Sequence, residues 1–345
     1  MKRSDRFFTL QENVFQRDHV RINETLFSLA NGFIGLRGNH DEANLLDSLN
    51  GTYLNSFHER NFMAHGEKLY GFPEEGQTML NVTDAKIIRV EVDNELFSLE
   101  TSHFEEYRRV LNMKTGVLYR SILWITASGQ KLRIESWRLA SFENKHLCAI
   151  NYRITPVECS ADIYIHSLVN ADVINIDVKD DPRIGSSFGG KVLYPFQKEL
   201  GDDYVLLVQK SKFSEKIVGT MVQNVIHHGT AEEAEIINDE MLMGIRYTFT
   251  PDGPIELNKY ISYDFGYVET YHNVYENLTR ALDHAESATF DGLVEEQKRY
   301  LKKFWSSTDI EIEGDDLMAR ESDSIFFICC SQPAVTATQI SVPRA

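Results

Sequence analysis

The sequence predicts a mainly β protein, in which a large antiparallel sandwich is followed by two amphipathic helices. β-Prone runs recur at roughly ten-residue spacing between turn signals over residues 87–263, as they do in antiparallel sandwiches. Over residues 271–307 the apolar positions change to helical spacing. An early apolar run, residues 24–38, contains the Asn31-Gly32 pair, which predicts two short strands joined by a tight turn.

Composition places this chain among water-soluble globular proteins with room for two domains. Its 35 Lys and Arg residues against 52 Asp and Glu residues give a formal net charge of −17. Such a charge, with no basic stripe, argues against nucleic acid and anionic membrane as partners. No apolar run approaches the roughly 20 residues of a membrane helix, and the four cysteines lack metal or redox spacing. We therefore expect a cytoplasmic protein.

The elements are expected in the following order. Residues 5–24 predict a leading strand and a connector, and residues 42–84 predict a long aromatic loop over the sheet. The strands and strand pairs are expected at residues 87–99, 117–137, 147–168, 204–209, 216–225, 235–237, 245–250 and 255–263, with a loop at 180–190. The two helices break near Asp291-Gly292, and their apolar face has little in this chain to cover it.

Polar side chains beside the glycine turn are the candidate substrate-binding residues: Arg37, His40, Asp41 and Glu42. They could reach a sugar or merely hold the turn in place. A nucleotide-phosphate loop is disfavoured there, because no helix follows the glycines. The adjacent acid pairs, such as Glu105-Glu106, do not predict a catalytic couple, since neighbours in a strand face opposite sides. We therefore assign no catalytic residue and no metal ligand.

Two stretches resemble the amino-terminal region of glycoside hydrolase family 65. The first is residues 24–42 with Gly51-Thr52-Tyr53, and the second is the linker end at residues 304–316, beginning Phe304-Trp305. The similarity runs from about residue 10 to Asp316 and is greatest to the maltose phosphorylases. That family contains inverting disaccharide phosphorylases, so the resemblance implies a role in carbohydrate metabolism.

The resemblance further implies a galactose-mutarotase-like β-supersandwich, a two-helix linker and then an (α/α)6 catalytic barrel. It implies homodimers without metal or organic cofactor. A glutamate in the barrel is the general acid, and inorganic phosphate is the co-substrate that attacks a glucosyl disaccharide. For a maltose phosphorylase the products are glucose 1-phosphate and glucose. The acid protonates the departing oxygen, and the phosphate needs no second carboxylate as base.

Against that pattern, we expect residues 1–268 to form the β-domain, 269–308 the linker and 309–316 the start of the catalytic domain. Residues 317–345 depart from the family pattern and include an unusual Cys329-Cys330 pair. Codons exist for this tail that give a family-like helix in another reading frame. We therefore expect an aberrant, frameshifted tail, a missing catalytic barrel and a fragment that is inactive alone.

Two other functions stay open. A stand-alone carbohydrate-binding or dimerisation module would use the aromatic side chains of residues 53–72 as stacking faces for sugars. An independent sandwich enzyme of the sugar-epimerase type rests on analogy of fold alone.

Overall fold

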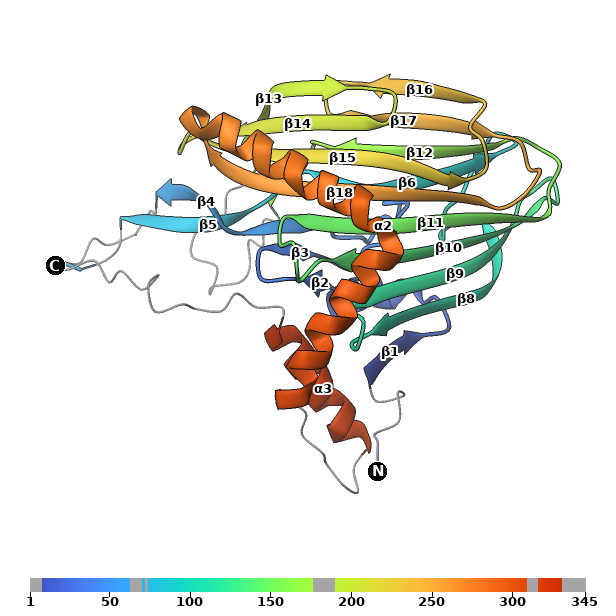
Figure 1. Cartoon of the computed structure of the whole chain (residues 1–345), viewed down its shortest axis with the longest axis horizontal. Coiled ribbons are helices and arrows are strands. Elements are labelled where there is room, and N and C mark those ends of the chain that lie inside the picture. The colour runs from blue at the N-terminus through green and yellow to red at the C-terminus, as the bar shows by residue number, and fades with distance from the viewer. Residues whose placement is uncertain (1–7, 63–69, 72–73, 176–189, 309–315, 331–345) are drawn as a thin grey trace.

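A nine-stranded antiparallel sheet is the largest element of the structure, which is a computed structural model describing residues 8–62, 70–71, 74–175, 190–308 and 316–330 (Figure 1). Its strands, in spatial order, are β1 (Thr9–Glu12), β8 (His103–Asn112), β9 (Val117–Ile125), β10 (Lys131–Ala140), β11 (Leu147–Glu158), β18 (Ile255–Tyr267), β15 (Lys216–His228), β14 (Tyr204–Ser211) and β13 (Leu193–Leu200).

Two smaller sheets complete the β-domain. A five-stranded sheet runs in the order β16 (Glu233–Asn238), β17 (Leu242–Phe249), β12 (Ile163–Asn170), β6 (Asp84–Val92) and β7 (Glu95–Leu96). A four-stranded sheet contains β2 (Leu29–Ala30), β3 (Ile34–Leu36), β4 (Thr52–Phe62) and β5 (Glu75–Asn81). The helical elements are η2 (Arg17–His19), α1 (Val20–Leu26), η3 (Val268–Thr270), α2 (Tyr271–Thr308) and α3 (Asp316–Cys330).

The hydrophobic core lies between the nine-stranded and five-stranded sheets. Alternate residues of each strand face inward, so Leu132 and Ile134 of β10 share one buried cluster with Ile163 and Ile165 of β12. Each fully buried aliphatic side chain of this kind contributes about 1.5–3 kcal/mol relative to exposure. The mainly β antiparallel sandwich expected from the sequence is confirmed.

A buried lysine joins the two facing sheets. Lys259, on β18 of the nine-stranded sheet, donates hydrogen bonds to the carbonyl oxygens of Ile87 at 2.9 Å and Leu168 at 2.8 Å. Those two residues are partners across β6 and β12, beside a shift in register between Leu168 and Asn170. Burial lowers the pKa of Lys259 to about 7, although nearby carboxylates oppose this shift.

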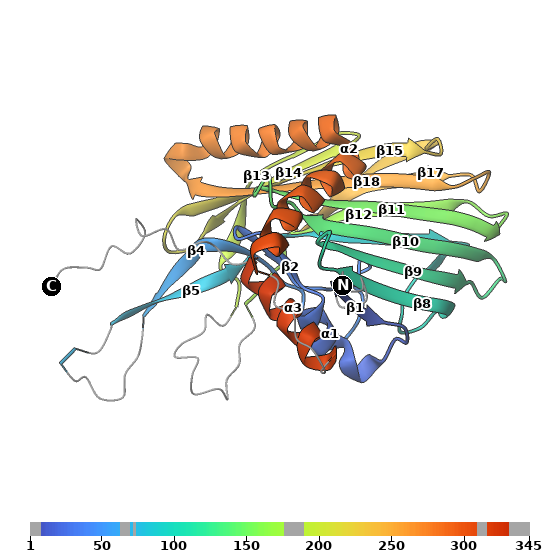
Figure 2. The same cartoon turned by 60° about the horizontal axis from the view of Figure 1, so that its bottom comes forward.

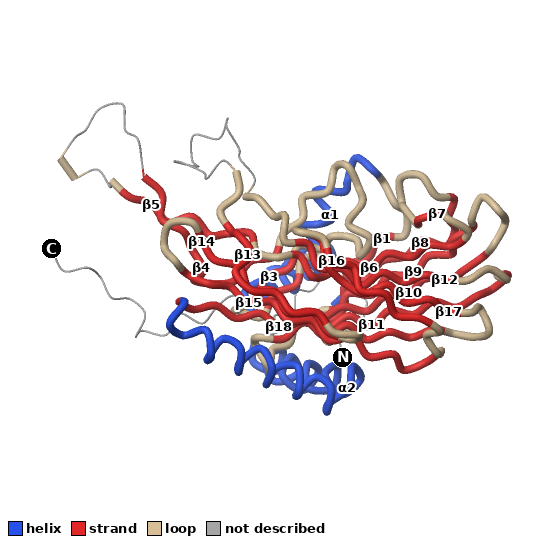
Figure 3. The backbone as a smooth tube through the Cα atoms, turned by 90° about the horizontal axis from the view of Figure 1, so that it is seen from above, coloured by secondary structure: helices blue, strands red, loops and turns tan. Residues whose placement is uncertain are grey.

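Helix α2 crosses the outer face of the nine-stranded sheet and forms a third layer (Figures 1 and 3). Its apolar face is buried there, with Val274, Leu278 and Leu282 in one cluster with Leu206 and Ile217 of the strands. The expectation that little in this chain covers this face is therefore wrong, because outward-facing apolar residues of the nine-stranded sheet cover it.

A close approach at Gly219 allows α2 to lie flat on β15. A Cβ atom added at Gly219 would lie 2.6 Å from Cδ1 of Leu278, so a larger residue would push the helix away. The helix breaks at Thr289, whose φ of 62° is not helical. This break is close to the Asp291-Gly292 position expected from the sequence.

The second half of α2 is anchored by two buried polar side chains. Nε2 of Gln297 donates to the carbonyl of Ala140, while Oε1 of Gln297 accepts from the amide of Phe142, both at 3.0 Å. Nε1 of Trp305 donates to the carbonyl of Met113 at 3.0 Å. These bonds fix the linker to the carboxyl end of β10 and to the turn between β8 and β9. Figure 2 shows α2 descending past these strands toward α3.

Several expectations need correction. The segment expected to be a long loop contains β4 and β5, and the connector after β1 contains the short helix α1. The ranges expected to pair at residues 147–168 are β11 and β12, which lie in different sheets. The tail, expected to be aberrant from residue 317 onward, begins with the helix α3. The loop at 180–190 lies almost wholly outside the described residues.

Within the described residues, no helix combines the length and apolar character that crossing a membrane requires.

The Lys259 contact generates the first prediction. Lys259→Met should lower the free energy of unfolding by about 2–4 kcal/mol at pH 7, because two buried carbonyl oxygens lose their donor. Exposed Lys198 on β13 gives the control, since Lys198→Met should change it by less than about 0.5 kcal/mol. Urea unfolding measures both values.

The pH dependence of this contact has a defined sign. Folding lowers the pKa of Lys259 from 10.5 to about 7, so the unfolded chain binds this proton more tightly. The wild-type protein should therefore gain stability between these pH values, by at most about 1.4 kcal/mol per pH unit, and Lys259→Met should lack this gain. A stability difference between the two proteins that narrows as the pH rises would contradict this assignment.

Candidate functional site

The Asn31-Gly32 turn folds as the sequence predicts and delivers the candidate residues into the domain. Oδ1 of Asn31 accepts hydrogen bonds from the amides of Phe33 at 3.0 Å and Ile34 at 2.8 Å, and Gly32 has a φ of 88°. Strands β2 and β3 pair on either side of it. After β3 the chain passes Gly38, where an added Cβ would lie 2.7 Å from the backbone of Phe27. The loop of residues 38–42, here named the inner loop, follows directly.

Three arginines from neighbouring strands face this inner loop. Arg109 on β8 and Arg120 on β9 are partners across the ladder, and Arg138 follows on β10. All three are at most 3% exposed. Burying a guanidinium is costly unless an anion or several acceptors are provided. The inner loop provides them.

Two carboxylates of the inner loop neutralise Arg120 and Arg138, while Arg109 donates to the carbonyl of Gly38. Glu42 accepts two hydrogen bonds from Arg120, at 2.7 and 2.6 Å, in a bidentate pair. Asp41 accepts from Arg138 and from the Ser136 hydroxyl, and lies 3.1 Å from Nη2 of Arg120. Burial alone would raise the pKa of Asp41, but Arg138 and Arg120 lower it to about 2. Asp41 is therefore a permanent anion at neutral pH.

His40 belongs to a separate polar chain on the same loop. Its Nε2 lies 3.1 Å from the Tyr107 hydroxyl, which donates to Glu12 at 2.8 Å. Burial, assisted by Arg109 and the two other arginines, lowers the pKa of His40 well below 6.5. Because the Tyr107 hydroxyl uses its hydrogen in the bond to Glu12, its oxygen accepts from His40. A neutral His40 therefore donates from Nε2, and its Nδ1 is an acceptor. This arrangement orders the loop, and His40 and Tyr107 are only 6% and 7% exposed.

The space between the inner loop and the arginines is too small for a substrate. A cavity of about 10 Å³ is lined by Asn39, His40, Asp41 and the three arginines, among others. This volume is about that of one water molecule. Several nitrogen atoms here have no hydrogen-bond partner among the residues that the structure describes, including Nδ1 of His40 and Nε of Arg120. A water molecule fits the cavity, whereas a sugar ring has no room.

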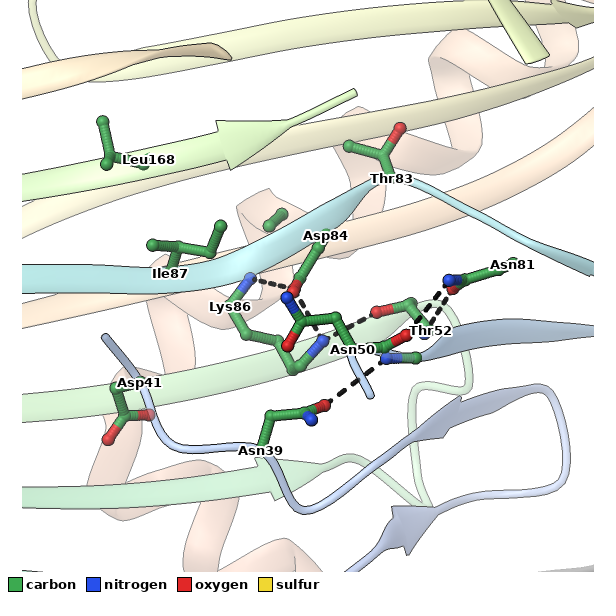
Figure 4. A network of polar contacts seen from close by, with 12 residues as sticks. Asn39, Asp41, Asn50, Thr52, Asn81, Thr83, Asp84, Lys86, Ile87 and Leu168 are labelled. Atoms are coloured by element: carbon green, nitrogen blue, oxygen red, sulfur yellow. Dashed lines mark hydrogen bonds and ion pairs between the residues drawn. The ribbon is translucent and has the colours of Figure 1, made fainter. Parts of the chain in front are cut away.

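A further buried ion pair, between Lys86 and Asp84, lies on β6. Nζ of Lys86 is 2.6 Å from Oδ1 of Asp84 and donates to the Thr52 hydroxyl at 2.9 Å (Figure 4). Burial lowers the pKa of Lys86. Burial alone would raise the pKa of Asp84, but the neighbouring Lys86 ammonium outweighs this effect and lowers it. Asn81 joins this network by accepting from the amide of Thr52 at 2.9 Å. The pair ties β4 to the start of β6.

Arg37 differs from the three residues that follow it, because it remains partly exposed. Its Nη2 donates to the carbonyl of Arg21 at 3.2 Å and lies 3.6 Å from the Glu24 carboxylate. Glu24 is itself buried and accepts from the amide of Leu49 at 3.0 Å. All four candidate residues thus make contacts within the β-domain, and this burial favours the role of holding the turn over the role of binding a sugar.

The other candidates from the sequence are not brought together. Glu105 and Glu106 are exposed, and so are Asp202 and Asp203. Residues 180–181 and Asp315 lie outside the described residues. In the part of the chain that the structure describes, no group of His, Cys, Asp or Glu side chains could hold a metal ion.

The aromatic loop expected to stack on sugars also folds differently. Phe57 lies in the core and is 0% exposed, and Tyr53 is half-buried. Tyr70 is fully exposed, while residues 63–69 and 72–73 lie outside the described residues. The described part of this segment therefore gives little support to a sugar-binding surface there.

The arginines and Lys86 are residues that the sequence reading missed. A signal was present, because Arg120 shares the inward parity of Leu118, Ile122 and Trp124 on β9. A cationic residue at one of the inward-facing, otherwise apolar positions of a strand predicts a buried partner for its charge. It does not predict which distant carboxylate will provide it.

The inner loop generates the second prediction. Arg120→Met should lower the free energy of unfolding by about 3–5 kcal/mol, because two buried carboxylates lose a charged partner. Exposed Arg108, one residue before Arg109, gives the matched control, and Arg108→Met should change it by less than about 0.5 kcal/mol. Equal effects of the two substitutions in urea unfolding would contradict the buried network.

Acid should weaken the same contact. Folding lowers the pKa of Asp41 from 3.8 to about 2. The ionised Asp41 carboxylate therefore contributes its full stabilisation at pH values above the ordinary pKa of 3.8. That contribution is lost as the pH falls through this range. Arg120→Met should reduce the acid sensitivity of the unfolding free energy between these two pH values.

Comparison with known proteins agrees with this architecture. The chain is 35% identical over 324 residues to an α,α-trehalose phosphorylase of Thermoanaerobacter brockii, covering 89% of this chain and 40% of that protein. It is 29% identical over 316 residues to a maltose phosphorylase of Bacillus subtilis, with coverage of 89% and 40%. The chain thus spans about two-fifths of the length of these relatives.

A solved structure matches the fold. A human-microbiome protein, named only provisionally as a kojibiose phosphorylase, superposes with a TM-score of 0.82 at 18% identity. The match covers 94% of this chain and 41% of that one. The family model for the N-terminal domain of glycosyl hydrolase family 65 matches residues 10–304. The chain therefore belongs to glycosyl hydrolase family 65 and contains its N-terminal domain.

Proposed function

We propose that this chain forms the scaffold part of a disaccharide phosphorylase and does not itself carry the reacting groups. The supporting observation is the state of its carboxyl groups. Among the described residues, every carboxyl group with a shifted pKa is shifted downward: Asp41, Glu59, Asp84 and Glu256. A general acid that protonates a departing glycosidic oxygen needs the opposite shift.

The causes of these shifts are structural contacts. Burial would raise the pKa of each carboxyl group, but charged or hydrogen-bonding neighbours outweigh it. Glu59, for example, accepts from the amides of Phe213 at 3.0 Å and Ser214 at 3.2 Å, and so joins β4 to the turn before β15. Such a carboxylate is held as an anion, and both of its oxygens accept hydrogen bonds from backbone amides. It fixes the fold and is poorly suited to donating a proton.

The proposed reaction is the phosphorolysis of a glucosyl disaccharide, with inorganic phosphate as co-substrate and no metal or organic cofactor. Relatives of this chain include proteins named trehalose, maltose and kojibiose phosphorylases. Identity is higher to the two trehalose phosphorylases, 35% and 31%, than to the maltose phosphorylase, 29%. Maltose, expected from the sequence resemblance, is therefore one candidate beside α,α-trehalose. The role proposed for this chain is the same with either sugar.

An activity assay tests the proposed role. The purified chain, incubated with maltose, α,α-trehalose or kojibiose and inorganic phosphate, should release no glucose 1-phosphate above a no-protein control. The trehalose phosphorylase of Thermoanaerobacter brockii, assayed in parallel on α,α-trehalose, is the positive control for detection. Phosphate-dependent release of glucose 1-phosphate that follows the chain through purification would show that the reacting groups lie within it.

A further inference from the structure

A groove on the outer face of the nine-stranded sheet plays no part in the scaffold role proposed above. It has a volume of about 550 Å³, within the range of roughly 300–1,000 Å³ that is usual for small-molecule sites. Strands β8–β11 and β18 form its floor, and Phe290 and Val294 of α2 form one wall. Figure 1 shows these strands continuing beyond α2, where no helix covers them.

The register explains why the groove begins at this point. Leu139 and Ala149 lie side by side on this outer face and are buried with α2 in one apolar cluster. Two residues farther along, the same face presents Tyr119, Trp137 and Asn151 in one cross-strand row. The row after that contains Arg153 and Glu256. The outer face therefore changes from apolar to aromatic and polar where the helix leaves it.

The aromatic part of the groove is a half-buried pair. The rings of Tyr119 and Trp137 lie 5.1 Å apart at an interplanar angle of 39°, and both side chains remain partly exposed. The Arg153 guanidinium lies 5.4 Å from the centre of the Trp137 ring. The Tyr119 hydroxyl is fixed in turn by donating to Glu135 at 2.7 Å. Together these contacts hold an aromatic surface in place before any ligand binds.

The polar part is equally ordered. Glu256 accepts from Nη2 of Arg153 at 2.7 Å and from Nδ2 of Asn151 at 2.7 Å. Asn151 also donates to Asn258 at 2.6 Å, so its amide orientation is defined. Burial would raise the pKa of Glu256, but Arg153 and Asn151 lower it, so the group remains a carboxylate. Donors and acceptors are therefore fixed side by side at the edge of the aromatic surface.

These features match a neutral sugar better than an anion. A pyranose ring presents an apolar face of C–H groups and a rim of hydroxyls, each both donor and acceptor. The groove offers an aromatic surface together with fixed donors and acceptors. Two of its three lining cations, Arg153 and Lys298, are paired with Glu256 and Glu295, at 2.7 and 2.5 Å, and Arg108 is the third. A phosphate would also meet the carboxylates of Glu256 and Asp291.

We propose that this groove is a non-catalytic binding site for a neutral glucosyl saccharide, with Trp137 as the stacking residue and Arg153, Asn151 and Glu256 as hydrogen-bonding groups. The site lies on the opposite side of the nine-stranded sheet from the inner loop. This proposal does not depend on the scaffold role proposed above, because it predicts that the sugar binds in the groove without being turned over.

Calorimetric titration of the full chain with maltose and with α,α-trehalose tests this proposal. At least one of them should bind saturably at millimolar concentrations, and Trp137→Ala and Arg153→Ala should each weaken binding by about tenfold or more. Tyr267→Ala is the matched control, because Tyr267 is 53% exposed at the end of β18 and does not line the groove. It should leave the affinity within about twofold.

Tryptophan fluorescence gives an independent readout of location. The chain has three tryptophans, of which Trp124 and Trp305 are buried and Trp137 is half-exposed. The sugar should change the emission of the wild-type chain, and Trp137→Phe should abolish that change while remaining folded by circular dichroism. The proposal is overturned if neither sugar binds the wild-type chain, or if both groove variants bind as the wild type does.

Discussion

Three inward-facing arginines and the inner loop that accepts their hydrogen bonds constrain the rest of this domain. Arg109, Arg120 and Arg138 lie in the interior of the sandwich, where isolated guanidinium groups would be strongly destabilising. The carboxylates of Asp41 and Glu42 reach Arg138 and Arg120, and the Gly38 carbonyl accepts from Arg109, after a hairpin that turns tightly at Gly32 and passes close to Phe27 at Gly38. The glycine-rich stretch is therefore required by charge pairing deep in the fold.

The same solution recurs across the sandwich. Lys86 pairs with Asp84, and Lys259 donates to two carbonyl oxygens at an irregular point of the facing sheet. Buried pairs of this kind add little net stability compared with well-packed apolar residues, but breaking one leaves a costly unpaired charge. Through Thr52 on β4, and through Ile87 and Leu168 on β6 and β12, these two lysines join one sheet to another. This rigidity suits a scaffold whose outer face, including the groove beside α2, is left for other contacts.

Much of the fold could be predicted from residue patterns. The strand periodicity, the Asn31-Gly32 turn and the helical spacing of α2 are local signals, and the structure confirms them. Other features depend on distant partners. Strand β4 was missed because its polar residues, and a φ of 70° at Ser56, disguise the alternation. The burial of α2 depends on which sheet face is apolar, and a local pattern does not show this.

The candidate site was only half predictable for the same reason. The sequence drew attention to Arg37, His40, Asp41 and Glu42 because polar groups beside a glycine turn often serve function. The partners of His40, Asp41 and Glu42 lie on β8, β9 and β10, 67 to 97 residues away, and strand pairing alone decides that they meet. Parity marks Arg120 as inward-facing, but only the three-dimensional arrangement shows that the space left is water-sized.

Amide hydrogen exchange tests most directly whether the inner loop is a fixed structural element. In the structure the amide of Gly38 donates to the backbone carbonyl of Glu24 at 2.7 Å, and the amide of Ile88 donates to the backbone carbonyl of Asp41 at 2.8 Å. We expect the amides of Gly38 and Ile88 to exchange as slowly as those of β9 and β10, with no change when maltose and phosphate are added. Rapid exchange at these positions that slows on adding sugar or phosphate would show instead that the inner loop opens to bind substrate.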